Sequence, residues 1–565
     1  MPAPIYRETL RLESAHEDLA ADLFTQLRRL FPEQPQALLD SSDHARTPAP
    51  QRSRFSILAF SAGAWAETFR SRGAESFYTW LRQAWPSSEA DASREPCPFQ
   101  LGWVGYLGYE HQARFFRATH AVVVDHHTGT AQTQSVEHDW AAAVRSALST
   151  LHTAEVQPPP STVYLEDLQV RDSRGEYLEK IRAAQRQIAE GNSYEICLTT
   201  AVTGSLHGDP FDAYRMLRRA NRAPFTQFLS FPPGTDDDGV TLVSTSPERF
   251  LQVTPERIAR SEPIKGTRPR GATRDEDEAL ARDLAAHPKD RAENVMIADL
   301  VRNDLSVHAV PGSLRTERLC AVESYPSVHQ MVSTVSARID PQTHAARVVE
   351  AAFPPGSMTG APKISTCEIL RELETGPRGP YSGAAGYFST TGACDLSVLI
   401  RTLVVTHERR SVPEAVQPDF AGQSRGADRF HLGLGGAITA DSDPAAEWAE
   451  VITKSRGVLG TLGAEFPGTG GAGTAPGNTR TTAVGAGRQA EAPGPAAADH
   501  PAGNPAGADP VRADSAQADF GQADFGQGSR SPEADPAGAG IPAAGSAPGH
   551  PAGGSPAPGA AAAWA

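Results

Sequence analysis

A lysine occupies an unusual position in the stretch SEPIKGTRPRG, residues 261–271. Lys265 lies between prolines and is followed closely by Arg268 and Arg270. A lysine in such a loop can be a surface cation, a phosphate contact or a nucleophile, and only the neutral amine can attack. Because a charged neighbour lowers the pKa of a lysine, we expect the two arginines to favour the neutral amine. The stretch alone leaves all three roles open.

Carboxylates on two predicted helices could bind a metal. Apolar spacing predicts a helix over residues 289–305, and Glu293 lies near its apolar face, an unusual place for an uncompensated charge. On a second predicted helix, Glu447 and Glu450 share a face, with Lys454 one turn beyond. Oxygen ligands from two helices would suit Mg²⁺. Two solvated helix faces with ion pairs explain the same spacing, and the sequence does not show that the helices meet.

Two glycine-rich runs and one arginine are further candidates. FPPGSMTGAPKIS, residues 353–365, could cradle an anion with backbone N–H groups, although it lacks the Walker-loop spacing. HLGLGGAITADSDP, residues 431–444, gives a turn where the backbone can approach a ligand closely. Each run alone is better explained as a structural turn. Arg401, expected within an apolar strand, is either an edge charge or a carboxylate clamp.

The elements that must position these residues alternate without a regular βαβ repeat. Apolar residues at helical spacing predict a helix from Tyr177 that ends at Gly191, and β-branched runs predict strands around residues 241–253 and 396–405. Asp443, or Ser442 before it, is expected to cap the helix that carries Glu447. The mixture predicts an α+β fold rather than a doubly wound sheet.

Composition narrows the class of protein. The 565 residues carry a formal charge of −15, which argues against a nucleic-acid partner, and no apolar run is long enough to span a membrane. The N-terminus lacks the pattern of a secretory signal, and five scattered cysteines without a CxxC pair suit a reducing compartment. We therefore expect a cytoplasmic protein with no membrane partner.

Changes in composition predict three segments. An N-terminal domain is expected over residues 1–152 and a second ordered domain over 164–462, separated by a proline-rich linker. Residues 466–565 are rich in Pro, Gly and Ala and are expected to form a disordered tail.

Several runs together resemble one family. SPERF, PIKGTRPRG, AENVMIADLVRNDL, PPGSMTGAPK, YSGAAGYF, IRT and GGAITADSDPAAEWAE occur in the order seen in the chorismate-utilising enzymes. The match runs from about Tyr177 to Lys454, and LLDSS and LGWVGYLGYE match more weakly toward the N-terminus. The resemblance implies a magnesium-dependent α+β fold of antiparallel sheets with surrounding helices.

Two positions bear on which nucleophile is delivered to chorismate. Family members that add water carry a lysine where this chain has Glu195, so water addition is disfavoured. Anthranilate synthases typically read PIAGT where this chain reads PIKGT, and the lysine is similar to that of the aminodeoxychorismate synthases. The resemblance therefore implies amination of chorismate at carbon 4, through a covalent adduct on Lys265.

The resemblance also implies roles for matching positions. Glu248 would be the general acid, Glu293 and Glu450 would hold Mg²⁺ with Glu447 close behind, and the substrate would be bound by Thr267, Tyr381, Arg401, Gly435, Gly436 and Lys454. Family members often carry a histidine where this chain has Gln330; His329 lies one place earlier, and no role is assigned to it.

The expected partners follow from the same resemblance. No cysteine lies in the GxCxG elbow of a class I glutamine amidotransferase, so a separate amidotransferase subunit would supply ammonia. The expected product is 4-amino-4-deoxychorismate, passed to a separate lyase toward 4-aminobenzoate and folate. The alternatives are an anthranilate synthase component I and a non-catalytic chorismate-binding scaffold.

Overall fold

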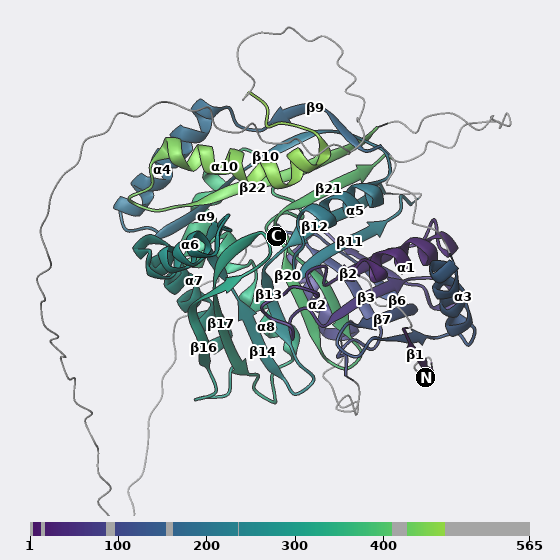
Figure 1. Ribbon diagram of the computed structural model, residues 1–565. Coiled ribbons are helices and arrows are strands. Elements are labelled where there is room, and N and C mark those ends of the chain that lie inside the picture. Colours follow the sequence, from purple (N-terminus) through teal and green to yellow (C-terminus); the bar gives the residue numbers. More distant parts are fainter. Residues whose placement is uncertain are drawn as a thin grey trace, which may run out of the picture. The chain divides into compact units, whose positions relative to one another are not determined.

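Two antiparallel sheets organise the chain in the computed structural model (Figure 1). The structure describes residues 4–12, 17–85, 96–153, 162–234, 237–408 and 427–468. Every strand pairing within these ranges is antiparallel, which confirms the expected α+β class of antiparallel sheets with surrounding helices.

The first sheet has twelve strands and carries Glu195 and the glycine-rich run at 431–444. Its order is β1 (Tyr6–Arg11), β8 (Thr130–Ser135), β7 (His120–Asp125), β3 (Phe55–Phe60), β2 (Gln36–Asp40), β11 (Phe225–Phe231), β12 (Gly239–Ser246), β21 (Thr402–His407), β22 (Asp428–Ile438), β10 (Glu195–His207) and β18 (Gly360–Ala361), with β9 (Tyr164–Val170) also paired to β10.

The second sheet has ten strands and carries Lys265. Its order is β15 (Ile264–Pro269), β17 (Val328–Arg338), β14 (Ile258–Glu262), β13 (Arg249–Val253), β20 (Cys394–Val398), β19 (Ala384–Ser389), β5 (Gly102–Leu107), β6 (Ala113–Ala118) and β4 (Thr68–Ser71), with β16 (Arg315–Ser324) paired to β17.

Ten helices are described: α1 (Leu19–Leu27), α2 (Ala74–Ala84), α3 (Trp140–Thr153), α4 (Arg174–Ala189), α5 (Pro210–Ala220), α6 (Arg274–Ala286), α7 (Pro288–Ser306), α8 (Ala345–Ala352), α9 (Lys363–Leu373) and α10 (Pro444–Leu459). A Ser173 capping box begins α4, and its buried stripe includes Tyr177, as predicted. The Asp443 side chain caps α10, which was one of the two expected caps.

The two sheets pack face to face. Successive side chains along a strand point to opposite faces, so one set packs against the other sheet and the other set packs under the helices. In β7, Val122 and Val124 pack under the helices, whereas Val123 faces the other sheet. Leu229 of the first sheet and Tyr387 of the second belong to that shared core. Helices α1, α3, α4, α5 and α10 cover the outer face of the first sheet, while α2, α7 and α8 cover the second. In Figure 1, α4 and α10 lie side by side over β10 and β22.

The expected boundary between residues 152 and 164 does not separate two compact units. Both sheets contain strands from before and after it, and one compact unit runs from Met1 to Gly471. Hydrophobic burial across the sheet-to-sheet interface joins the two halves of the chain. Phe466 is buried and packs edge-on against Trp448, so the ordered part passes the expected limit of 462. The rest of the predicted tail lies outside the described residues. No helix in the described ranges is long and apolar enough to cross a membrane.

Candidate active site

Lys265 meets a carboxylate from the other sheet. Its Nζ atom, on β15, forms an ion pair with Oε1 of Glu195 at the start of β10. Glu195 is fully buried, and its Oε2 atom has no hydrogen-bond partner in the described part of the chain. Burial opposes the charge on Lys265, but the Glu195 carboxylate outweighs burial and raises the pKa of the lysine above its usual range. The amine is therefore an ammonium before substrate binds.

The expectation that Arg268 and Arg270 lower the pKa of Lys265 is wrong. Arg268 pairs with Asp283 at 2.7 Å and Asp290 at 2.9 Å, and Arg270 pairs with Asp277 at 2.6 Å. A guanidinium already neutralised by its own carboxylate exerts little net field on a neighbouring amine. The direction of the shift is set by Glu195 instead.

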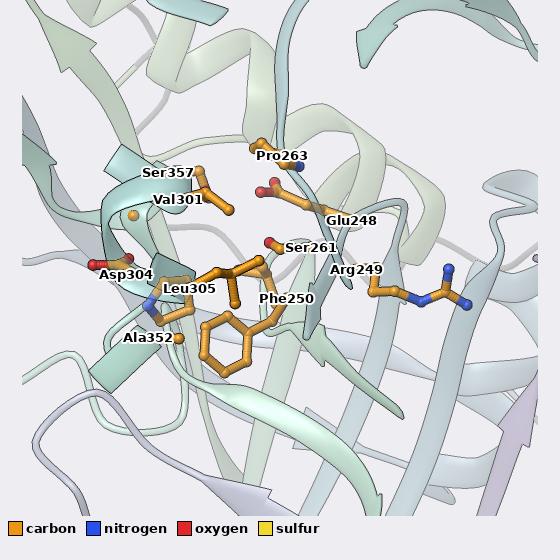
Figure 2. A pocket seen from close by; sticks show the side chains of 13 residues that line it. Glu248, Arg249, Phe250, Ser261, Pro263, Val301, Asp304, Leu305, Ala352 and Ser357 are labelled. Atoms are coloured by element: carbon orange, nitrogen blue, oxygen red, sulfur yellow. The ribbon is translucent and has the colours of Figure 1, made fainter. Parts of the chain in front are cut away.

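Glu248 lies between β12 and β13 and is buried. Burial raises the pKa of its carboxyl group to about 7, and the neighbouring Ser357 hydroxyl and Lys265 ammonium offset only part of that rise. Figure 2 shows its side chain pointing toward Ser357. A carboxyl group with a pKa near neutrality can both give and take a proton, which is the property a general acid needs.

The ammonium group of Lys289 lies among the three carboxylates that are predicted to bind the metal. The Nζ atom of Lys289, in the first turn of α7, lies 3.8 Å from Oε1 of Glu293 and 3.4 Å from Oε1 of Glu447 on α10. Glu450, one turn further along α10, also contributes to the raised pKa of Lys289. Side chains from α7 and α10 therefore meet, a point that the sequence left open.

The donor set suits a hard divalent cation, although it does not enclose one. Burial raises the pKa of Glu293 to about 7, and no hydrogen bond to its carboxylate is found within the described ranges. Those ranges contain no group of three His, Cys, Asp or Glu residues in metal-binding geometry. An ammonium instead lies among the carboxylates of Glu293, Glu447 and Glu450. Oxygen donors are the ligands that Mg²⁺ prefers, but the cation that lies among these carboxylates in the structure is the Lys289 ammonium.

The glycine-rich run on β22 lies beside these carboxylates. The Nζ atom of Lys454 pairs with Glu450 at 2.7 Å and donates to the carbonyl of Gly435 at 3.0 Å. A Cβ atom at Gly436 would lie 3.3 Å from Oε2 of Glu447, so the missing side chain leaves room beside α10. The structure thus groups Lys454, Gly435 and Gly436 with the candidate metal ligands.

Tyr381 packs against the same strand. A Cβ atom added at Gly433 would lie 2.1 Å from the Tyr381 ring, so only glycine leaves space for this buried tyrosine. Burial raises the pKa of the Tyr381 phenol, which therefore stays protonated and can act as a hydrogen-bond donor.

Arg401 does not lie within a strand, which corrects the expectation. It falls in the break between β20 and β21 with a φ of 51°, and its carbonyl accepts a hydrogen bond from the backbone of Thr245 at 3.2 Å. No carboxylate pairs with its guanidinium in the described part of the chain, and burial lowers its pKa. A buried guanidinium without an anion suits a substrate carboxylate.

Thr267 is exposed, two residues beyond Lys265 on β15, and no contact within the described ranges joins its side chain to the other candidates. His329 is buried against α6, where its ring nitrogens contact Asp277 at 3.0 Å and Ser324 at 2.8 Å. These contacts explain its burial without any part in the site.

Two residues near the site escaped the sequence analysis. Lys289 is four residues before Glu293, and this helical spacing could have identified it. Ser357, in the run proposed as an anion cradle, lies in the short helix η4 (Gly356–Met358) and lines a cavity beside Glu248. The lysine of that run, Lys363, pairs with Asp304 at 2.7 Å and is not available as an anion contact.

Comparison with known proteins assigns the family. Residues 34–460 match the model of the chorismate binding enzyme family. The chain belongs to this family.

Two curated relatives and one solved structure show how far the similarity extends. The aminodeoxychorismate synthase of Streptomyces griseus is 41% identical over 71% of this chain and 56% of its own length. Aminodeoxychorismate synthase component 1 of Escherichia coli K12 is 35% identical over 65% of this chain and 78% of its own length. The crystal structure of anthranilate synthase component I from Streptococcus pneumoniae superposes with a TM-score of 0.57 at 25% identity, covering 72% of this chain and 92% of that one. The chain therefore spans only about half the length of the Streptomyces relative.

Proposed function

We propose that this member of the family aminates chorismate at carbon 4 to give 4-amino-4-deoxychorismate. The observation that carries the proposal is the position of Lys265. Its side chain is only 11% exposed, pairs with Glu195, and lies near enough to Glu248 and Glu293 to affect their charges. The names of the Streptomyces griseus and Escherichia coli relatives support the same reaction.

The reaction replaces a hydroxyl group by an amine with retained configuration, and two displacements achieve this. Lys265 first gives its proton to Glu195, whose Oε2 atom has no partner in the described part of the chain, so that the pair becomes neutral. The amine then adds at carbon 2, the double bonds shift, and the carbon–oxygen bond at carbon 4 breaks. Glu248 protonates the departing hydroxyl to give water.

In the second displacement, ammonia adds at carbon 4 and the double bonds shift back. The bond from carbon 2 to the lysine nitrogen breaks, and Lys265 leaves as a neutral amine that recovers its proton from Glu195. The overall change is chorismate plus ammonia to 4-amino-4-deoxychorismate plus water.

We propose that Mg²⁺ is held by Glu293 and Glu450, with Glu447 beside them. When bound, the ion would neutralise a substrate carboxylate and fix its position. Arg401, Lys454 and the Tyr381 hydroxyl would bind the remaining oxygens of chorismate. Each of these groups presents a cation or a hydrogen-bond donor next to β22 or the β20–β21 break.

We propose that a separate glutamine amidotransferase subunit supplies the ammonia. The designation of the Escherichia coli relative as component 1 supports a partner component. The product would lead toward 4-aminobenzoate and folate. All five cysteines are free thiols, which is consistent with a reducing compartment such as the cytoplasm.

Anthranilate synthesis is the second candidate, because the solved relative from Streptococcus pneumoniae is an anthranilate synthase component I. Mass spectrometry of the products made from chorismate, Mg²⁺ and ammonium at alkaline pH distinguishes the two. We expect 4-amino-4-deoxychorismate from the wild type and little or none from Lys265→Ala. Anthranilate from the wild type would favour the second candidate, and the absence of any product would favour a chorismate-binding scaffold.

A further inference from the structure

A small cavity lies directly beside Glu248 (Figure 2). Its volume is about 10 Å³, which is room for one molecule the size of water or ammonia. Glu248 forms one side, Ser357 of η4 another, and Val301 and Asp304 of α7 a third. Phe250 contributes an apolar wall. The cavity is therefore a small space next to the predicted general acid.

One polar group at this cavity, the hydroxyl of Ser357, has unused hydrogen-bonding capacity. Ser357 is 7% exposed, and its Oγ atom has no hydrogen-bond partner in the described part of the chain. It lies close enough to the Glu248 carboxyl group to offset part of the rise in the pKa of Glu248, although the two groups do not form a hydrogen bond of normal geometry. By contrast, Asp304 is satisfied, because Lys363 pairs with it at 2.7 Å. A buried hydroxyl without a partner is costly, so a small polar molecule between Ser357 and Glu248 would stabilise both groups.

The stereochemistry of the reaction restricts which small molecule can occupy the cavity. Retention at carbon 4 requires ammonia to approach the face from which the hydroxyl departed. Glu248 protonates that hydroxyl, so ammonia must arrive on the Glu248 side. Ammonia has three N–H donors and one lone pair. It can donate to the Glu248 carboxylate and to Ser357 Oγ while the lone pair stays free to attack.

We propose that this cavity, between Ser357 and Glu248, is the site where ammonia is held before it attacks carbon 4. The inference rests on the proposed function. It assigns Ser357 as the residue that binds the nitrogen nucleophile, and it gives Glu248 a second task.

This arrangement accounts for every proton that is transferred in the two displacements. Glu248 loses its proton to the departing hydroxyl in the first displacement and is then a carboxylate. Ammonia forms the new bond at carbon 4 with its lone pair and becomes a substituted ammonium. One of its protons passes to the Glu248 carboxylate, which restores the acid for the next cycle. Because burial raises the pKa of Glu248 to about 7, both transfers occur near neutral pH.

The test separates the two displacements. Chorismate and Mg²⁺ without ammonium should load Lys265 with chorismate less one water, which intact-protein mass spectrometry detects. Ammonium chloride, added in increasing amounts, then discharges the adduct. We expect Ser357→Val, which fills the cavity and removes the hydroxyl, to form the adduct within about twofold of the wild-type rate. The ammonium concentration for half-maximal discharge should rise at least tenfold.

Ser357→Ala, which leaves the space open, should give an intermediate rise in that concentration. Ser306→Ala, an exposed serine near the end of α7, serves as the matched control and should leave both steps unchanged. Thermal melting checks that each variant is folded.

Three outcomes would overturn the inference. Normal adduct formation with unchanged ammonium dependence in Ser357→Val would show that the cavity holds only water. Equal slowing of both displacements would show that Ser357 positions Glu248 rather than ammonia. If the wild type forms no adduct, the proposed function itself fails, and the inference falls with it.

Discussion

Lys289 provides a direct test of the candidate metal site. Its ammonium lies 3.4 Å from Glu447 and 3.8 Å from Glu293, so Mg²⁺ must displace it to reach those oxygens. The lysine side chain is 47% exposed, and the dielectric of water is therefore appropriate. Each attraction is then worth about 1 kcal/mol. Allowing for the entropy that the free lysine regains, we expect Lys289→Gln to bind Mg²⁺ about tenfold more tightly, or about 1.4 kcal/mol.

Isothermal titration calorimetry with Mg²⁺ measures this change without depending on activity. Arg274→Gln is the matched control, because it removes one positive charge from an exposed residue whose one ion pair within the described ranges is with Glu278 on α6. Lys289→Arg keeps the charge and should bind Mg²⁺ as the wild type does. The gain for Lys289→Gln should shrink in 1 M salt, where charges are screened within about 3 Å. Equal or weaker Mg²⁺ binding by Lys289→Gln would refute the reasoning.

Three further predictions concern Glu248, Gly433 and Arg401. The folded-state pKa of Glu248, raised to about 7 by burial from 4.5, means that wild-type stability falls as the pH rises from about 4.5 to 7. Glu248→Gln should therefore become the more stable protein above pH 7, by up to about 3 kcal/mol in chemical denaturation, and a pH-independent difference would contradict this. Gly433→Ala should destabilise the fold by about 1–3 kcal/mol, because the new methyl group would clash with the Tyr381 ring; an unchanged melting temperature would argue against that packing. Arg401→Lys should raise KM for chorismate about tenfold or more through loss of a charged hydrogen bond, and steady-state kinetics with an unchanged KM would remove Arg401 from the substrate site.

The local elements could be predicted from sequence because local patterns determine them. The helix from Tyr177, the Asp443 cap and the helix bearing Glu293 all depend on residues within a few positions of one another. The prediction of a strand through Arg401 was wrong because the backbone at this residue has a positive φ. An apolar sequence pattern does not indicate such a break. The boundary expected between residues 152 and 164 lies within one compact unit, since strands far apart in sequence complete the same two sheets.

The sequence by itself determined the chemical inventory: a lysine in the PIKGT run, a glutamate where related enzymes carry a lysine, and carboxylates at helical spacing. Only the tertiary structure decided how these groups affect one another. Lys265 and Glu195 are 70 positions apart, and the packing of the two sheets brings them into contact. That contact raises the pKa of Lys265, whereas the sequence predicted that it would be lowered. A charge shielded from water responds to the nearest opposite charge in space rather than to its neighbours along the chain.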